Sequence, residues 1–182
     1  MSKVLQRQMQ IWIKKNKNKL IFYLNFNFFF PKFKSKLLNT EISIKHLILI
    51  KYTTKKFKVR YSETDQMGFV HHSNYLKYFE LARIEWLNEL NFPYKRLEEN
   101  SVIMPVIDAE IFFKSPAFFD DLLCVELTLL EIPKVKVRFK YKVLNQLGKE
   151  VAIGSTTLAF LNSQTKRPIR CPESLTDKLQ SL

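Results

Sequence analysis

The fold is decided by residues 61–83, which read YSETDQMGFVHHSNYLKYFELAR. This stretch predicts the end of a strand, a polar turn with one carboxylate (Asp65), and the start of a long apolar helix. The first four amides of a helix lack partners inside it and carry the positive end of its dipole. The sequence therefore predicts an acid beside a site that stabilises an oxygen gaining negative charge, which suits chemistry on a carbonyl group.

A strand is predicted at residues 55–61, where Phe57, Val59 and Tyr61 alternate with basic residues. It leads into a four-residue turn that has Asp65 first and Gly68 last. Each of these residue types is favoured at that position of a turn. A purely structural role for Asp65 is therefore the alternative to a chemical one.

The long helix is predicted at residues 74–90, with Ser73 or Asn74 capping its first amides. Its apolar positions are Tyr75, Tyr78, Phe79, Ala82, Trp86 and Leu90, and the stripe is widened by Leu76, Leu81, Ile84 and Leu87. A helix that is apolar over so much of its circumference is expected to be wrapped by other elements. Pro93 ends it, because the residue before a proline is pushed out of the helical region.

After a linker at residues 95–101, the chain predicts strands at residues 103–114, 122–132, 134–144 and 149–161. In the third strand, apolar residues from Val135 to Val143 alternate strictly with Lys and Arg, so one face is in contact with a core and the other is in water. The turn at residues 145–148 predicts that the last two strands are antiparallel neighbours. Residues 172–182 predict a short final helix.

The order of strand, long helix and four further strands predicts an α+β fold, in which an antiparallel sheet of about five strands is wrapped around one long central helix. With 182 residues, one domain with a real core is expected. The sequence shows no internal repeat, and its three glycines make a glycine-rich phosphate loop improbable. Two cysteines form no metal-ligand pattern and fit a reducing compartment.

The net charge of +13 is confined to one end of the chain. Residues 1–56 hold 13 Lys/Arg and one acid, whereas residues 57–182 hold 17 Lys/Arg and 16 acids. The nearly neutral folded part does not predict nucleic acid as a partner. We therefore expect a basic, low-complexity leader at residues 1–54 and a folded domain at residues 55–182.

The leader does not predict a transmembrane helix, because its apolar run at residues 20–30 is shorter than the roughly 20 residues that cross a bilayer. No small-residue cleavage site follows that run, which argues against a secretory signal. The leader is interpreted either as an organelle-targeting segment or as upstream sequence wrongly read as protein. A surface-binding tail is the third alternative. The expected location is cytoplasmic, or an organelle if the leader is a targeting segment.

Residues 61–83 resemble the signature of hotdog-fold acyl-CoA thioesterases of the 4-hydroxybenzoyl-CoA thioesterase and Tol-Pal-associated types. The matching features are Asp65, Gly68, the hydrophobic pair 69–70, the two histidines and Asn74-Tyr75. Beyond the motif, the resemblance rests on the order and spacing of elements from residue 55 to about residue 177. It implies a hotdog fold and an enzyme that hydrolyses an acyl-CoA, or acyl carrier protein, thioester without a cofactor or metal.

The resemblance also implies roles for individual residues. Asp65 matches the catalytic nucleophile or general base, and His72 matches the position whose backbone N–H polarises the thioester carbonyl. Gly68, Asn74 and Tyr75 fall at substrate-binding positions, and Gly68 lets the backbone approach the substrate. A homodimer or homotetramer with active sites between subunits is implied as well.

Other residues and functions are alternatives. His71 is expected to face away from the site, and Glu80, the helix position that carries the carboxylate in another thioesterase branch, is expected to form a surface ion pair with Arg83. A non-catalytic acyl-thioester-binding protein, a hotdog dehydratase and a basic surface-binding module that uses the leader are the rival functions. The sequence does not identify the acyl group, and a naphthoyl-CoA substrate is one option.

Overall fold

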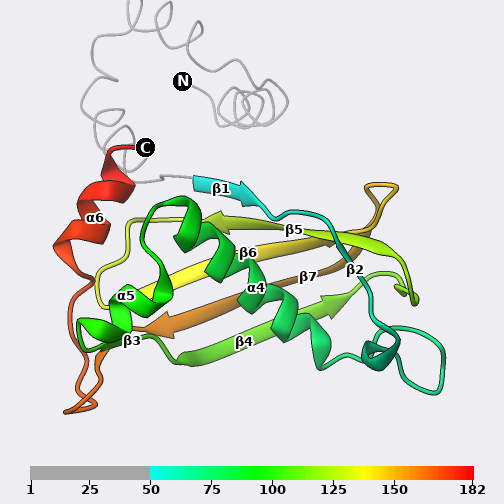
Figure 1. The fold of residues 1–182 in the computed structure, drawn as a ribbon, viewed down its shortest axis with the longest axis horizontal. Helices are drawn as coiled ribbons and strands as arrows, with labels where there is room; N and C mark the ends of the chain where they lie inside the picture. The colour runs from blue at the N-terminus through cyan, green and yellow to red at the C-terminus, as the bar shows by residue number, and fades with distance from the viewer. Residues whose placement is uncertain (1–49) are drawn as a thin grey trace, which may run out of the picture. The chain divides into compact units, whose positions relative to one another are not determined.

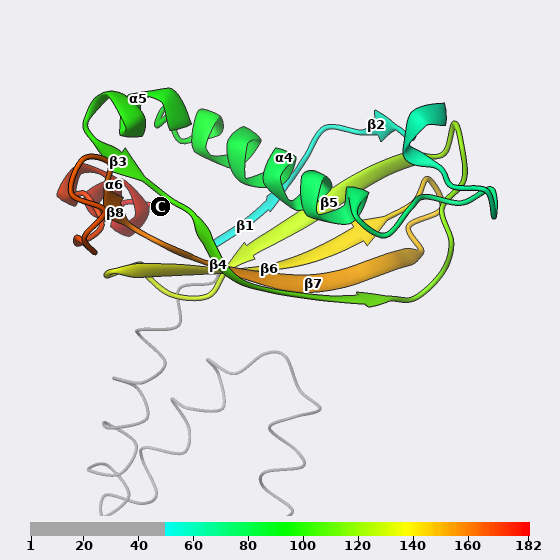
Figure 2. The ribbon, with the colours of Figure 1, turned by 90° about the horizontal axis from the view of Figure 1, so that it is seen from below.

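Helix α4 (Asn74–Glu89) lies along the concave face of a curved antiparallel sheet (Figures 1 and 2). The computed structural model describes residues 50–182. The main sheet has the order β1-β5-β6-β7-β4, and β2 pairs with β5 beside β1. The expected α+β fold, with a sheet around one long helix, is confirmed.

The strands of the main sheet are β1 (Ile50–Thr53), β2 (Phe57–Lys58), β4 (Val106–Phe113), β5 (Leu122–Leu129), β6 (Lys136–Leu144) and β7 (Glu150–Ala159). A separate pair is formed by β3 (Val102–Ile103) and β8 (Leu161–Asn162). As predicted, β6 and β7 are antiparallel neighbours joined by a turn that ends at Gly148, whose φ is +73°. Among residues 50–182, strand β4 has a sheet neighbour only on its β7 side.

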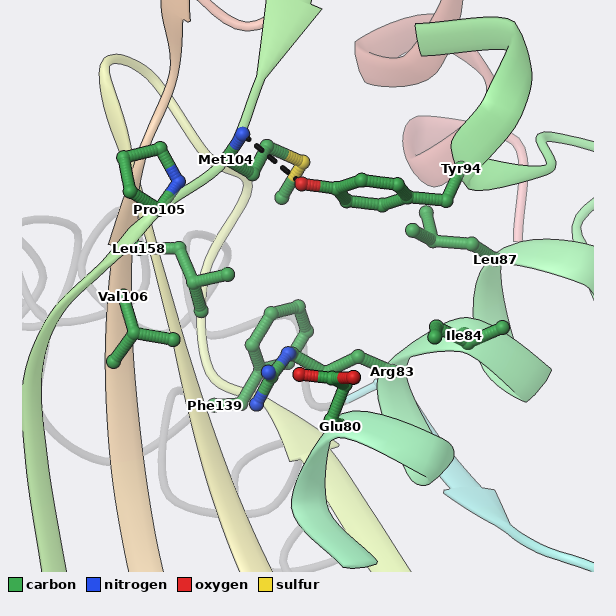
Figure 3. A pocket seen from close by; sticks show the side chains of 10 residues that line it. All are labelled: Glu80, Arg83, Ile84, Leu87, Tyr94, Met104, Pro105, Val106, Phe139 and Leu158. Atoms are coloured by element: carbon green, nitrogen blue, oxygen red, sulfur yellow. Dashed lines mark hydrogen bonds between the residues drawn. The ribbon is translucent and has the colours of Figure 1, made fainter. Parts of the chain in front are cut away.

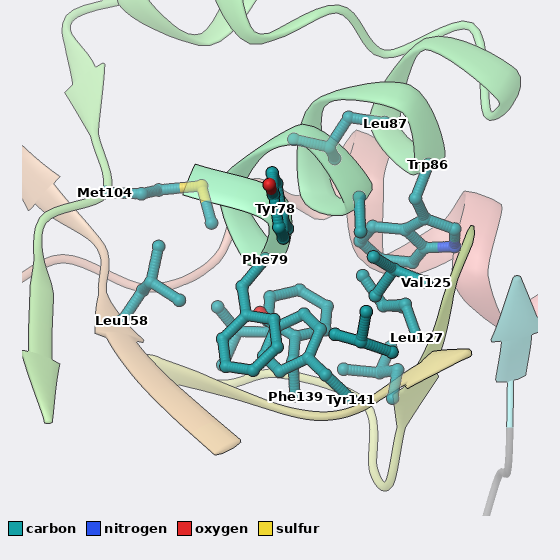
Figure 4. Packing of buried hydrophobic residues seen from close by; sticks show 14 of the residues in the cluster. Tyr78, Phe79, Trp86, Leu87, Met104, Val125, Leu127, Phe139, Tyr141 and Leu158 are labelled. Carbon is teal, nitrogen blue, oxygen red and sulfur yellow. The ribbon is translucent and has the colours of Figure 1, made fainter. Parts of the chain in front are cut away.

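The core is formed where α4 packs on the sheet (Figure 4). The ring of Phe79 is fully buried and stacks on Tyr141, with centroids 4.2 Å apart and planes 7° from parallel. Gly154 allows this contact, because a Cβ there would lie 2.8 Å from the Phe79 ring and 2.5 Å from the Glu110 carbonyl oxygen. Trp86 packs edge-on against Phe139 one layer further along the helix.

The sheet begins earlier than the boundary expected between residues 54 and 55. Strand β1 pairs with β5, from Ile50 opposite Leu129 to Thr53 opposite Glu126. Ile50 and Tyr52 pack against the core, but their residue types are those of the biased leader, so composition alone did not separate them from it. The expectations about residues 1–49 lie outside the described residues.

The strand expected at residues 55–61 is wrong in its extent. Only β2 is a strand there, and a 3-10 turn, η2 (Tyr61–Glu63), follows it. The backbone of Val59 is hydrogen-bonded although the residue lies outside the strand: its N–H donates to the Asp121 carbonyl, and its carbonyl accepts from the Asp120 N–H. The regular strand therefore ends earlier than the alternation of apolar and basic residues predicts.

Two further differences concern the chain after α4. The expected linker at residues 95–101 contains the short helix α5 (Tyr94–Glu99), which buries only Leu97 and so carries little hydrophobic periodicity. The strand expected at residues 103–114 is divided into β3 and β4, since the chain leaves β3 at Met104-Pro105. The expected final helix is present as α6 (Glu173–Gln180).

The helix α4 is less completely wrapped than its sequence predicts. Leu76 and Ile84 are 44% and 39% exposed, although both widen the apolar stripe. Glu80, which is also exposed, lies midway between them at intervals of four residues, so the three residues share one side of the helix. Part of the apolar stripe of α4, at Leu76 and Ile84, is therefore left exposed within residues 50–182.

Within residues 50–182, no helix is both long enough and apolar enough to cross a membrane.

Candidate active site

The loop before α4 is a tight hairpin in which Thr64 pairs with Val70. The Asp65 N–H donates to the Phe69 carbonyl (3.1 Å), and the Gly68 N–H donates to the Asp65 carbonyl (2.9 Å). The Asp65 side chain takes part as well, because its Oδ1 accepts the Met67 N–H at 2.8 Å. The prediction that Asp65 stabilises the turn is thus confirmed. This structural role uses only one of its two carboxylate oxygens.

The second carboxylate oxygen of Asp65 accepts none of the hydrogen bonds found within residues 50–182, and the residue is half-buried. Gly68 is required for its conformation, since its φ is +84°. A Cβ on Gly68 would meet no atom within 4 Å in this chain. The turn can therefore support chemistry at the free oxygen of Asp65.

Glu63 ties this loop to the helix. Its backbone carbonyl accepts from the Asn74 side-chain amide (2.8 Å) and from the His71 N–H (2.9 Å), and its carboxylate accepts from the Tyr78 hydroxyl (3.2 Å). Burial, together with the Glu63 carboxylate, raises the pKa of Tyr78. The expectation that Ser73 or Asn74 caps the helix is wrong: Ser73 is the N-cap residue without a side-chain cap, and Asn74 is buried and binds backwards to the loop.

Most amides at the entrance of α4 already have acceptors. The Ser73 N–H donates to His71 Nδ1 (3.3 Å), the Asn74 N–H to the His71 carbonyl (3.0 Å), and the Tyr75 N–H to the His72 carbonyl (3.4 Å). The prediction of several free amides is therefore wrong for these three residues. The His72 N–H donates to no acceptor found within residues 50–182.

His71 and His72 lie together, contrary to the expectation that His71 faces away. Their ring centroids are 3.9 Å apart, and His71 Nδ1 lies 2.8 Å from Ser73 Oγ. The interactions of Nδ1 with Ser73 hold the His71 ring over the entrance of the helix. The side chain of His72 is exposed.

Tyr75 has a packing role in this chain. It is 3% exposed, its ring packs edge-on against Phe113 at 5.2 Å, and burial raises its pKa to about 12. A substrate contact for Tyr75 stays a prediction. Its contact with Phe113 places the Asp65 loop beside the C-terminal end of β4.

A cavity of about 400 Å³ lies against the middle of α4 (Figure 3). It is lined by Glu80, Arg83, Ile84, Leu87, Tyr94, Met104, Pro105, Val106, Phe139 and Leu158. The Tyr94 hydroxyl on one wall accepts the Met104 N–H at 3.2 Å. Neither Asp65 nor His72 lines this cavity, which adjoins the opposite end of β4, at Val106.

The cavity has one buried charged group. Arg83 is 8% exposed, and its Nη1 donates to the Tyr141 hydroxyl (3.1 Å) and to Thr156 Oγ1 (3.4 Å). Burial raises the pKa of Tyr141, so this partner is neutral. The predicted ion pair between Glu80 and Arg83 is wrong: the ion pairs within residues 50–182 do not include Arg83.

The sequence profile of the thioesterase-like superfamily matches residues 59–179. The chain belongs to this superfamily. A 1,4-dihydroxy-2-naphthoyl-CoA hydrolase from Synechococcus elongatus is 29% identical over 124 residues, which cover 67% of this chain and 90% of that protein. The acyl-CoA thioesterase YbgC of Haemophilus influenzae is 36% identical over 88 residues, which cover 48% of this chain and 65% of that protein.

Solved structures agree with this assignment. The crystal structure of DHNA-CoA thioesterase from Staphylococcus aureus superposes with a TM-score of 0.67 at 30% identity, covering 72% of this chain and 89% of that one. The fold is thus the hotdog fold, and the family is one of thioester hydrolases. The predicted resemblance to hotdog acyl-CoA thioesterases is confirmed.

Sequence reasoning missed two residues that organise the site. The spacing of Glu80 and Arg83 predicts a surface ion pair, but the position of Arg83 among Phe79, Ala82 and Trp86 on the apolar stripe is a signal of burial. Glu63 gave no such signal, because its contacts with Asn74 and Tyr78 span 11 and 15 residues of the chain.

Proposed function

We propose that this protein hydrolyses an acyl-CoA thioester to the free acid and CoA. Asp65 acts as nucleophile or general base, and the His72 N–H stabilises the oxyanion. The observation that supports this most is that one loop carries two groups that take part in none of the hydrogen bonds found within residues 50–182, namely the second carboxylate oxygen of Asp65 and the backbone N–H of His72.

In the general-base route, the oxygen of a water molecule bonds to the thioester carbonyl carbon while its proton passes to Asp65. The carbonyl electrons move to the oxygen, which the His72 N–H stabilises; one such donor contributes about 2.7–4 kcal/mol in a well-studied hydrolase. When the oxyanion collapses, the C–S bond breaks, and the departing CoA sulfur takes the proton from Asp65. In the nucleophilic route, Asp65 itself bonds to the carbonyl carbon, CoA thiolate leaves, and water then cleaves the mixed anhydride.

The acyl group needs a cavity, and the one beside α4 belongs to the same chain but adjoins the other end of β4. A second copy resolves this separation. Strand β4 is an open edge with exposed large apolar residues, among them Ile107, Phe112 and Phe113. Such an edge favours pairing with another strand, and a two-fold pairing with itself is antiparallel.

Antiparallel pairing sets the Phe113 end of one β4 against the Val106 end of the other. The Asp65 loop adjoins Phe113 through Tyr75, and the cavity is lined by Val106. The catalytic loop of each copy is thereby brought to the cavity of the other. We therefore propose a homodimer with two composite sites, and the exposed Leu76–Ile84 face of α4 adds to the surface that becomes covered.

The experiment is free-thiol release from a panel of acyl-CoAs that includes aliphatic, benzoyl and naphthoyl thioesters. Asp65→Asn is expected to lower kcat/KM by about 10²- to 10⁴-fold. The melting temperature is expected to be unchanged, because the Asn side-chain oxygen can still accept the Met67 N–H. Asp177→Asn, on the exposed side of α6, is the matched control. Equal rates for wild type and Asp65→Asn would remove Asp65 from the mechanism, and no release from any thioester would refute the function.

A further inference from the structure

Residues 71–74 form a turn that leads into α4, and the His72 N–H in this turn is the proposed oxyanion donor. The His71 carbonyl accepts the Asn74 N–H at 3.0 Å. Because a trans peptide is planar, the N–H of one residue points opposite to the carbonyl of the residue before it. The His72 N–H therefore points away from the Asn74 amide, and its direction depends on how firmly the peptide between His71 and His72 is held.

The His71 ring holds this turn through one nitrogen. His71 Nδ1 accepts the Ser73 N–H at 3.3 Å and lies 2.8 Å from Ser73 Oγ. A ring nitrogen that accepts a hydrogen bond carries no proton, so the ring proton is on Nε2 and the Ser73 hydroxyl donates to Nδ1. The bond spans two residues, as the side-chain bonds of Asn and Asp do at the start of a turn. The His71 N–H adds a second anchor by donating to the Glu63 carbonyl at 2.9 Å.

These anchors leave one amide of the turn available to a ligand. The N–H groups of His71, Ser73, Asn74 and Tyr75 each have an acceptor, whereas the His72 N–H has none within residues 50–182. The His72 side chain is exposed and makes no hydrogen bond in this part of the chain, so it does not restrain its own backbone. The hydrogen bonds that restrain the His72 N–H therefore come from His71.

We infer that His71 is a positioning residue for the proposed hydrolysis: its Nδ1, by accepting the Ser73 N–H, holds the His72 N–H in the direction that the oxyanion requires. This inference rests on the proposed function. The oxyanion exists only after the carbonyl carbon has been attacked. Loss of the positioning is therefore expected to raise the barrier of the chemical step and to leave the binding of the thioester unchanged.

The test separates the acceptor nitrogen from the ring that carries it. His71→Phe keeps a ring beside His72 but has no acceptor, whereas His71→Asn loses the ring and keeps an acceptor oxygen that suits the same turn. For the acyl-CoA that wild type cleaves fastest, His71→Phe is expected to lower kcat about 10- to 100-fold with little change in KM, because small misplacements of a reacting group have effects of this size. His71→Asn is expected to keep kcat within about threefold of wild type, since it restores the acceptor.

Ser73→Ala tests the same contact from its other side. It removes the hydroxyl that donates to Nδ1 and leaves the backbone donor, so kcat is expected to fall severalfold, again with little change in KM. Ser181→Ala, at the exposed end of the chain after α6, is the matched control and is expected to leave both constants unchanged. Melting temperatures show whether each variant is folded.

Nitrogen NMR of histidine-labelled wild type gives a readout that does not depend on turnover. The chain has three histidines, and the signals of His71 are those that disappear in His71→Asn. At pH 8, Nδ1 of His71 is expected to be unprotonated and Nε2 protonated. The opposite tautomer would overturn the inference, because Nδ1 could then not accept the Ser73 N–H.

The outcomes distinguish this inference from the proposed function. If wild type releases thiol, then an unchanged kcat in His71→Phe, or an equal loss in His71→Phe and His71→Asn, would overturn the inference and leave the hydrolysis in place. Should His71→Phe fail to fold, an unchanged kcat in Ser73→Ala would overturn it. No release from any thioester by wild type would refute the proposed function, and the inference with it.

Discussion

The Asp65 loop and the Arg83 cavity both adjoin α4, yet they are held in different ways. The loop is held by hydrogen bonds that converge on Glu63 and leave Asp65 and His72 with spare capacity. The cavity is held by packed apolar side chains around one buried cation. In this chain the group suited to chemistry and the space suited to an acyl chain are thus at opposite ends of β4, which is the basis of the proposed homodimer with composite sites.

The largest expected effect comes from keeping the two regions apart. The double substitution Ile107→Glu/Phe112→Glu adds four like charges across a self-paired β4 and is expected to leave a folded monomer whose thiol release falls about 10²-fold or more. Light scattering after gel filtration measures the mass, and the thiol assay measures the activity. Leu147→Glu, in an exposed hairpin, is the control for added charge. A monomeric double variant with full activity would contradict the composite site.

Crowding the packed region is expected to reduce stability strongly. Gly154→Ala places a methyl group against Phe79 and the Glu110 carbonyl, and is expected to lower the free energy of unfolding by about 1–3 kcal/mol. Gly148→Ala meets no atom within 4 Å and costs only backbone strain from its positive φ, about 1 kcal/mol. Urea titration distinguishes the two variants. A smaller loss for Gly154→Ala than for Gly148→Ala would show that the Phe79 contact relaxes easily.

Loosening the hydrogen-bonded region is expected to affect turnover more than stability. Asn74→Ala removes the hydrogen bond from the Asn74 amide to the Glu63 carbonyl. Because that carbonyl still accepts the His71 N–H, the free energy of unfolding is expected to fall by only about 1 kcal/mol. The kcat is expected to fall about tenfold with little change in KM, because the loop is displaced and the cavity is not. Asn88→Ala, at an exposed position of the same helix, serves as the control. A larger change in KM than in kcat would place Asn74 in substrate binding instead.

The smallest effect concerns the contact that joins the two regions, Tyr75 against Phe113. The folded pKa of Tyr75 is raised from 10.0 to about 12, so its neutral form contributes stability that is present below pH 10 and is lost as the pH rises toward 12. The melting temperature of Tyr75→Phe is expected to fall less between pH 9 and pH 11 than the melting temperature of the wild type. An identical pH dependence would mean that the hydroxyl reaches water.

Sequence periodicity predicted the parts of the fold that depend on it: the bounds of α4, the alternation of β6 and the β6–β7 hairpin. The α5 helix was missed because Leu97 alone is buried in it, and β1 because Ile50 and Tyr52 resemble the biased leader. The motif predicts Asp65 and His72 as site residues, and these roles stay predictions, whereas whether each N–H has an acceptor and where the Arg83 side chain points depend on contacts between distant residues. Arg83 bonds residues 58 and 73 positions away, which no local pattern records.

The most direct test of the central claim is thiol release by a mixed dimer of two variants with different tags. One chain carries Asp65→Asn, and the other carries Ile84→Trp to fill the cavity; each homodimer is expected to be inactive. In the mixed dimer, the intact Asp65 of one chain faces the intact cavity of the other, so about half of the wild-type activity is expected from one restored site of two. A mixed dimer as inactive as both parents would show that the loop and the cavity act within one chain.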